Sequence, residues 1–196
     1  HLKKIIESKE FVVQDLCNYG YWRLFDKSWS QLDFYNYGKF FDDSLRIYPK
    51  HKIVSLSDKK NKKIKIGFLS SDLKGDHSVT FFLKTILRNY NKNQFEIIIF
   101  NNHKENKISE KITNLIDKTV NIGKLNNLEA FNIIRKYNLD IMIDIMGYTS
   151  QNRIEFYKNR LAKKQVIWMG YCNTSGLSNM DYIIVDPNLV LKNEKK

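Results

Sequence analysis

From residue 63 to residue 187 the sequence alternates short, almost wholly apolar runs with longer segments of helical periodicity. The apolar runs have the length of strands and lack the polar alternation of a sheet with one solvated face. Strands that are apolar on both sides and separated by helices are typical of a parallel sheet, because the crossover connections place helices on both faces. We therefore predict an α/β fold, a Rossmann-like three-layer sandwich.

The predicted elements follow from this pattern. Strands are expected at 64–70, 95–100, 139–147, 165–171 and 180–186, and helices at 78–90, 105–117, 128–138 and 152–161. If the sheet is parallel and doubly wound, the runs at 64–70 and 139–147 belong to adjacent parts of one sheet.

The first third of the chain differs in character. Residues 1–48 repeat apolar positions at helical spacing, which predicts two or three helices. Residues 49–62 carry Pro, Ser, Asp and Lys without periodicity, which indicates a linker. We predict a helical segment with its linker over 1–60 and a Rossmann-like lobe over 61–196.

Composition narrows the range of partners. The net charge is +12 over 196 residues, but the lysines are scattered, so solvated charge is the simpler interpretation and nucleic acid is not the expected partner. No apolar run approaches the ~20 residues of a membrane span. Cys17 and Cys172 lie far apart in the sequence and have no metal-ligand spacing. We expect a cytoplasmic protein with no metal ion and no membrane partner.

The loops that follow the predicted strands carry the candidate chemistry. In a parallel sheet these loops share one edge, and those at 70–78, 146–152 and 170–176 combine Gly with hydroxyl residues, which lets backbone N–H groups approach an anion. His77 lies in the first loop. The simpler explanation for a histidine beside a helix start is a surface cap, although Ser78 or Asp76 can also cap this helix. Its place in a loop at the shared sheet edge predicts instead that His77 serves the chemistry and does not cap the helix.

Two other functions are disfavoured. Asp144 could suggest the phosphoacceptor of a receiver domain, but the acidic pair and the later Lys of that fold are not evident. The first loop also lacks the Gly-x-Gly-x-x-Gly spacing of dinucleotide binders, so NAD is not expected.

Three motifs taken together resemble a known family. They are IGFLSSDLKGDHSVTFFL at 66–83, DIMIDIMGYTSQNRIEFYKNR at 140–160 and QVIWMGYCNTSGLSNMDYIIVDP at 165–187. In content, order and spacing they are similar to the amino-terminal lobe of the catalytic region of protein O-GlcNAc transferases and bacterial SPINDLY-type proteins, glycosyltransferase family 41. The resemblance covers about residues 63–190. It implies one lobe of a GT-B glycosyltransferase, in which two Rossmann-like lobes enclose the active site and tetratricopeptide repeats precede them.

The resemblance also implies site residues. His77 matches the family's histidine at the active-site mouth, which contacts the donor sugar and the acceptor region. The loops Gly147, Tyr148, Thr149 and Thr174, Ser175, Gly176 match segments that line the cleft. The carboxyl-terminal lobe, which holds most of the nucleotide and diphosphate in the family, is expected to be absent from this chain.

These correspondences imply part of an enzyme that transfers N-acetylglucosamine from UDP-GlcNAc to Ser or Thr of acceptor proteins with inversion. The implied partners are the nucleotide-sugar donor, the acceptor proteins and the missing lobe, and no cofactor is expected. Two alternatives stay open. The chain could be a non-catalytic protein-interaction module, or part of a protein O-fucosyltransferase.

Overall fold

A computed structural model of the chain describes residues 12–48 and 63–188. Its centre is a six-stranded sheet in the order β3-β2-β1-β4-β5-β6, with every neighbouring pair parallel. The strands are β1 (Ile64–Ser70), β2 (Phe95–Asn101), β3 (Lys118–Asn121), β4 (Leu139–Asp144), β5 (Ala162–Trp168) and β6 (Tyr182–Ile184). The predicted adjacency of the first strand and the strand beginning at residue 139 is confirmed, because Phe68 of β1 pairs with Ile143 of β4.

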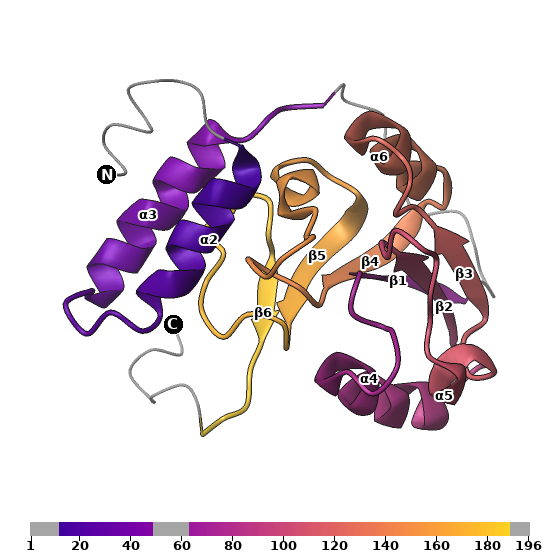
Figure 1. Cartoon of the computed structure of the whole chain (residues 1–196). Coiled ribbons are helices and arrows are strands. Elements are labelled where there is room, and N and C mark those ends of the chain that lie inside the picture. The colour runs from indigo at the N-terminus through magenta and orange to yellow at the C-terminus, as the bar shows by residue number, and fades with distance from the viewer. Residues whose placement is uncertain (1–11, 49–62, 189–196) are drawn as a thin grey trace.

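Helices cover both faces of this sheet (Figure 1). One face packs against α4 (Ser78–Asn89) and α5 (Glu110–Thr113), and the other against α6 (Asn127–Lys136) and the 3-10 helix η1 (Ile154–Lys158). Alternate residues of β2 contribute to the hydrophobic cores on the two faces. Ile97 and Ile99 join the core under α4, whereas Ile98 and Phe100 join the core under α6. The predicted three-layer sandwich is confirmed.

Two predicted helices are much shorter than the sequence pattern indicated. The expected helix at 105–117 is the single turn α5, and the unpredicted edge strand β3 follows it. The expected helix at 152–161 is the 3-10 turn η1. In this turn Ile154, Phe156 and Tyr157 are all buried, so their spacing reflects burial of most of a short segment instead of one face of an α-helix.

The amino-terminal segment forms a helix pair, α2 (Val13–Arg23) and α3 (Gln31–Ser44), and it shares the core of the lobe (Figure 1). The ring of Phe41 lies 4.8 Å from that of Tyr148, centroid to centroid. The predicted linker at 49–62 and the predicted boundary near residue 60 lie outside the described residues.

Backbone contact and polar bonds hold this helix pair on the lobe. Gly38 of α3 packs against Gly176, so closely that a Cβ placed on Gly38 would lie 2.6 Å from the Gly176 Cα. The carboxylate of Asp42 accepts hydrogen bonds from the Lys158 ammonium (2.7 Å) and from the Ser178 N–H (3.2 Å). The helix pair therefore forms part of the structure that positions the loop at 174–178.

Candidate functional site

The strand order reverses direction between β1 and β4, so the loops that leave their carboxyl ends run to opposite sides and leave a natural ligand position between them. Hydrogen bonds join the loops along this edge of the sheet. The Ser71 N–H donates to the Met146 sulfur (3.2 Å), and the Asn102 side-chain amide donates to the Gln151 carbonyl (2.8 Å). The carboxyl edge is therefore a connected structure instead of a set of independent loops.

His77 is the N-cap of α4. Its ring Nδ1 accepts a hydrogen bond from the Val79 N–H (3.3 Å), and its own backbone carbonyl accepts the first helical bond from Phe81. The expectation that Ser78 or Asp76 caps this helix was wrong, because the imidazole does so itself. The expectation that His77 does not cap a helix was wrong for the same reason.

This cap decides which tautomer the neutral ring adopts. Because Nδ1 accepts a hydrogen bond from the Val79 N–H, the ring proton is assigned to Nε2. Within the described part of the chain Nε2 has no hydrogen-bond partner, and the His77 side chain is exposed. The Nε2–H donor of His77 is thus available at the surface, while its acceptor atom Nδ1 is used by the helix.

His77 lines a hollow of about 300 Å³ whose walls come from the β1–α4 loop, α4 and α5. The other lining residues are Gly75, Asp76, Thr80, Phe81, Lys84 and Lys111. Lys111 of α5 pairs with Asp76, and its hydrogen bond and charge hold the pKa of that carboxyl below its usual value. The hollow offers one imidazole donor, an aromatic wall and the ammonium of Lys84.

Buried Asp144 fixes the loop that follows β4. Its two carboxylate oxygens accept hydrogen bonds from the N–H groups of Met146 and Gly147, both at 3.0 Å. Burial raises the pKa of Asp144 to about 6, although these two bonds oppose the shift. Gly147 has a φ of +57° and its Cα packs against Tyr171, so this position requires glycine. Asp144 acts on the backbone and is not exposed to a phosphoryl donor.

The two other predicted residues of this loop differ in exposure. The Tyr148 ring is buried against α3, and its hydroxyl donates to the Ser175 carbonyl (2.7 Å). Thr149 is half-buried, and its hydroxyl donates to the Met146 carbonyl (2.9 Å). Tyr148 therefore joins two loops through its side chain, and a ligand at this edge would meet the backbone instead of the phenol.

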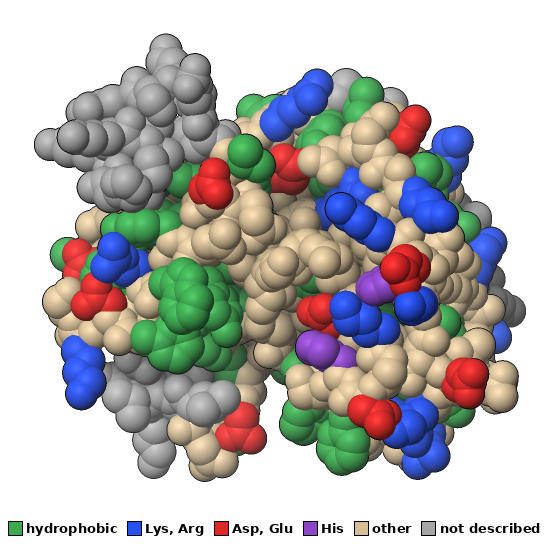
Figure 2. All heavy atoms as spheres, viewed as in Figure 1, with side chains coloured by type: hydrophobic (Ala, Val, Ile, Leu, Met, Phe, Trp, Pro, Cys, Tyr) green, Lys and Arg blue, Asp and Glu red, His purple; other side chains and the backbone are tan. Residues whose placement is uncertain are grey.

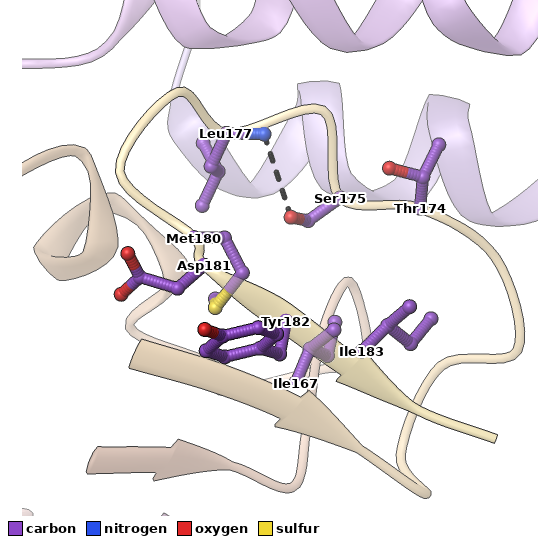
Figure 3. A pocket seen from close by; sticks show the side chains of 8 residues that line it. All are labelled: Ile167, Thr174, Ser175, Leu177, Met180, Asp181, Tyr182 and Ile183. Carbon is purple, nitrogen blue, oxygen red and sulfur yellow. Dashed lines mark hydrogen bonds between the residues drawn. The ribbon is translucent and has the colours of Figure 1, made fainter. Parts of the chain in front are cut away.

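Thr174 and Ser175 line a second hollow, of about 170 Å³, beside β5 and β6, whereas Gly176 is not among its lining residues (Figure 3). Thr174 is exposed, whereas Ser175 is buried and its Oγ accepts a weak hydrogen bond from the Leu177 N–H (3.4 Å). Gly176 has a φ of +68° and packs on Gly38. The structure thus puts His77 and the loop at 174–176 in different hollows of this lobe.

Arg153 is a structural centre of the carboxyl edge that the sequence analysis did not identify. Its buried guanidinium donates to the side chains of Asn102 (2.8 Å) and Asn127 (2.6 Å) and to the carbonyls of Ile122 and Leu125. Arg153 lies in the quoted motif at 140–160, yet no residue spacing in the sequence indicates that one arginine will hydrogen-bond across the loops after β2, β3 and β4.

Two further properties bear on ligands. Among the described residues, no three His, Cys, Asp or Glu side chains gather as they would around a metal ion. None of the helices in the described ranges is long and apolar enough to cross a membrane.

A profile described as Glycosyl transferase family 41 matches residues 44–191, which is most of the chain. The chain belongs to glycosyl transferase family 41. The match begins at Ser44, the last residue of α3, so it includes Tyr48 and the lobe but not the helix pair.

Individual relatives are similar over the same region. The probable UDP-N-acetylglucosamine--peptide N-acetylglucosaminyltransferase SPINDLY of Solanum lycopersicum is 26% identical over 147 residues, which are 72% of this chain and 16% of the relative. The UDP-N-acetylglucosamine--peptide N-acetylglucosaminyltransferase of Caenorhabditis elegans is 30% identical over 127 residues, 63% of this chain and 11% of the relative. The chain therefore spans about a sixth or less of the length of these relatives.

The fold also matches a solved structure. A mutant of the Thermobaculum terrenum O-GlcNAc transferase superposes with a TM-score of 0.82 at 18% identity, over 93% of this chain and 35% of the other. The lobe thus has the architecture of one part of a GT-B glycosyltransferase.

Proposed function

We propose that this chain forms the amino-terminal half of the catalytic cleft of a protein O-GlcNAc transferase, which moves N-acetylglucosamine from UDP-GlcNAc to Ser or Thr hydroxyls with inversion. Family membership supports the reaction class, and two relatives are named as UDP-N-acetylglucosamine--peptide N-acetylglucosaminyltransferases, one of them as a probable one. The observation that carries the assignment of the site is the position of His77, which lines a hollow at the carboxyl edge of the sheet with Nε2 available.

His77 positions a substrate group in this proposal. Displacement at an anomeric carbon needs an aligned hydroxyl, stabilisation of the departing diphosphate and a proton acceptor. Nε2–H donates to the sugar or to the acceptor oxygen and so supplies alignment. Proton abstraction by Nδ1 would displace the Val79 N–H and open the first turn of α4. We therefore assign the proton acceptor to another group.

The charges that line the hollow indicate which lobe binds the diphosphate. Lys84 and Lys111 are the cations that line the hollow at His77, and Lys111 is engaged by Asp76. A diphosphate carries more charge than Lys84 can balance, so we place its binding, and that of uridine, in the carboxyl-terminal lobe. The loops at Gly147–Thr149 and Thr174–Gly176 would then border the cleft, with acceptor proteins as the second substrate. A cytoplasmic setting without a resident metal completes the proposal.

A substitution that keeps the cap but removes the imidazole tests the role of His77. Asn is among the best N-cap residues, so His77→Asn retains the start of α4, whereas His77→Ala costs about 0.5–2 kcal/mol of stability. In the intact protein with labelled UDP-GlcNAc, we expect both variants to lose at least about 100-fold in transfer, the scale of losing a positioned polar group.

The competing function is a non-catalytic interaction module, which the capping role of His77 would favour. His77→Asn with wild-type transfer and His77→Ala with lower stability would show that the ring only caps the helix. Absence of transfer by the wild-type protein, with either UDP-GlcNAc or GDP-fucose, would overturn the enzymatic proposal. Transfer from GDP-fucose alone would change the donor and leave the site assignment in place.

A further inference from the structure

The outer surface of α4 is apolar on one flank and basic on the other. Phe81 and Phe82 are 70% and 55% exposed, and their rings touch edge to face with centroids 5.6 Å apart. Ile86 is 39% exposed one turn later. Figure 2 shows hydrophobic side chains gathered over this helix, with basic side chains, an acidic one and a histidine nearby. A cluster of this kind is typical of a surface that binds a partner.

Helical geometry arranges these side chains in rows. Residues four apart lie on the same face of a helix, so Phe82 and Ile86 form one row and Lys84 and Arg88 form another. Phe81, at about 100° per residue, lies between the two rows. The basic row is on the side of the hollow, because Lys84 and Phe81 line it together with His77.

We infer that this face of α4 is a docking surface for the acceptor polypeptide, in an extended conformation that alternates acidic and apolar side chains. The inference rests on the proposed function and names the class of acceptor. Successive side chains of an extended chain point to opposite sides, so one set would face Lys84 and Arg88 and the other Phe82 and Ile86. The α4 helix contains no acidic residue, and the carboxylate among the residues that line the hollow, Asp76, is paired with Lys111.

The length of the surface sets the length of the recognised segment. Along the helix axis, Phe81 lies about 6 Å and Arg88 about 16 Å from His77, at about 1.5 Å per residue. An extended chain advances about 3.3 Å per residue. The pattern therefore covers about two to five residues on one side of the acceptor hydroxyl, which itself reaches the hollow at His77.

The test is binding of a fluorescein-labelled peptide to the 196-residue chain, measured by anisotropy, in which a central Ser is flanked on both sides by alternating Glu and Ile. We expect binding that weakens at high salt, because exposed charges contribute. Phe82→Ser and Lys84→Glu should each weaken it at least about 10-fold, as expected for central contacts of an interface. Leu32→Ser, at a side chain about as exposed as Phe82, and Lys39→Glu, which makes the same charge change at an exposed lysine, are controls on α3 that should bind normally.

Further peptides separate the alternatives. A peptide of the same composition with Glu and Ile in separate blocks should bind at least about 10-fold more weakly, and equal binding would overturn the alternation. If the protein binds phosphatidylserine vesicles but not the peptide, and Phe82→Ser abolishes vesicle binding, the surface would be assigned to a membrane instead. If Phe82→Ser leaves transfer to this peptide by the intact protein unchanged, the docking surface alone is refuted. If the peptide binds but the intact protein transfers no sugar, the proposed reaction alone is refuted.

Discussion

Substitution of Gly38 by Ala should destabilise this protein, although the same change in the interior of most helices is stabilising. Ala in a helix interior is favoured over Gly by about 1 kcal/mol. At Gly38 the added Cβ would lie 2.6 Å from the Gly176 Cα and 3.3 Å from its nitrogen. To reach an ordinary contact, α3 and the loop at 174–178 must separate by about 1 Å, and overpacking of this kind costs about 1–3 kcal/mol.

After the propensity gain is subtracted, the net expectation is a loss of up to about 2 kcal/mol in the free energy of unfolding. For a chain of this length this corresponds to a fall of up to about 8 °C in Tm, measured by circular dichroism or calorimetry. Asn36→Ala is the matched control, because Asn36 is exposed on the same helix. It should raise stability by a few tenths of a kcal/mol through helix propensity alone.

A second comparison isolates the contact from backbone strain. Gly176 and Gly75 both have positive φ, +68° and +50°, but a Cβ on Gly75 would meet no atom within 4 Å. Gly176→Ala should therefore cost clearly more than Gly75→Ala. A Gly38→Ala protein more stable than the wild type would refute the reasoning, because it would mean that the helix pair does not rest on this loop.

Three more predictions concern the carboxyl edge. Burial raises the pKa of Asp144 from 3.8 to about 6, so the native state holds the proton more tightly and the free energy of unfolding should fall by about 3 kcal/mol as pH rises through this window. Urea titrations at several pH values should show that Asp144→Asn removes this part of the pH dependence. Tyr148→Phe leaves the Ser175 carbonyl without its donor and should cost about 1–2 kcal/mol by denaturant unfolding. Arg153→Lys cannot serve four acceptors at once and should cost about 3 kcal/mol or more, and a cost below 1 kcal/mol would contradict its role in joining the loops.

The fold was accessible from the sequence because its strands are buried on both faces. The run at 95–100 is apolar at nearly every position, and Ile97 and Ile98 bury on opposite sides of the sheet, so no alternation was needed to recognise it. Short edge elements were not accessible in this way. β3 is mostly exposed and carries Lys118 and Thr119, so it lacks the apolar signal on which the prediction depended.

The candidate site was accessible only in part, for a different physical reason. Topology predicted which loops share the carboxyl edge, but the direction of a side chain within a loop depends on contacts across the fold. The sequence could not show that the Tyr148 ring turns toward α3, or that the His77 imidazole bonds its own helix. The lysines that line the hollow were equally hidden, because Lys84 and Lys111 stand in a chain that is rich in lysine throughout.

The contact between Gly38 and Gly176 also determines where such a protein can be divided and rejoined. Consider a chimera that joins the helices of one family member to the lobe of another at residues 49–62. Two unmatched surfaces would then meet at a contact that is too close to accept even one added methyl group. An exchange made ahead of Val13 would carry α2 and α3 along with their own lobe. The helix pair and the lobe should thus be inherited, and engineered, as one piece.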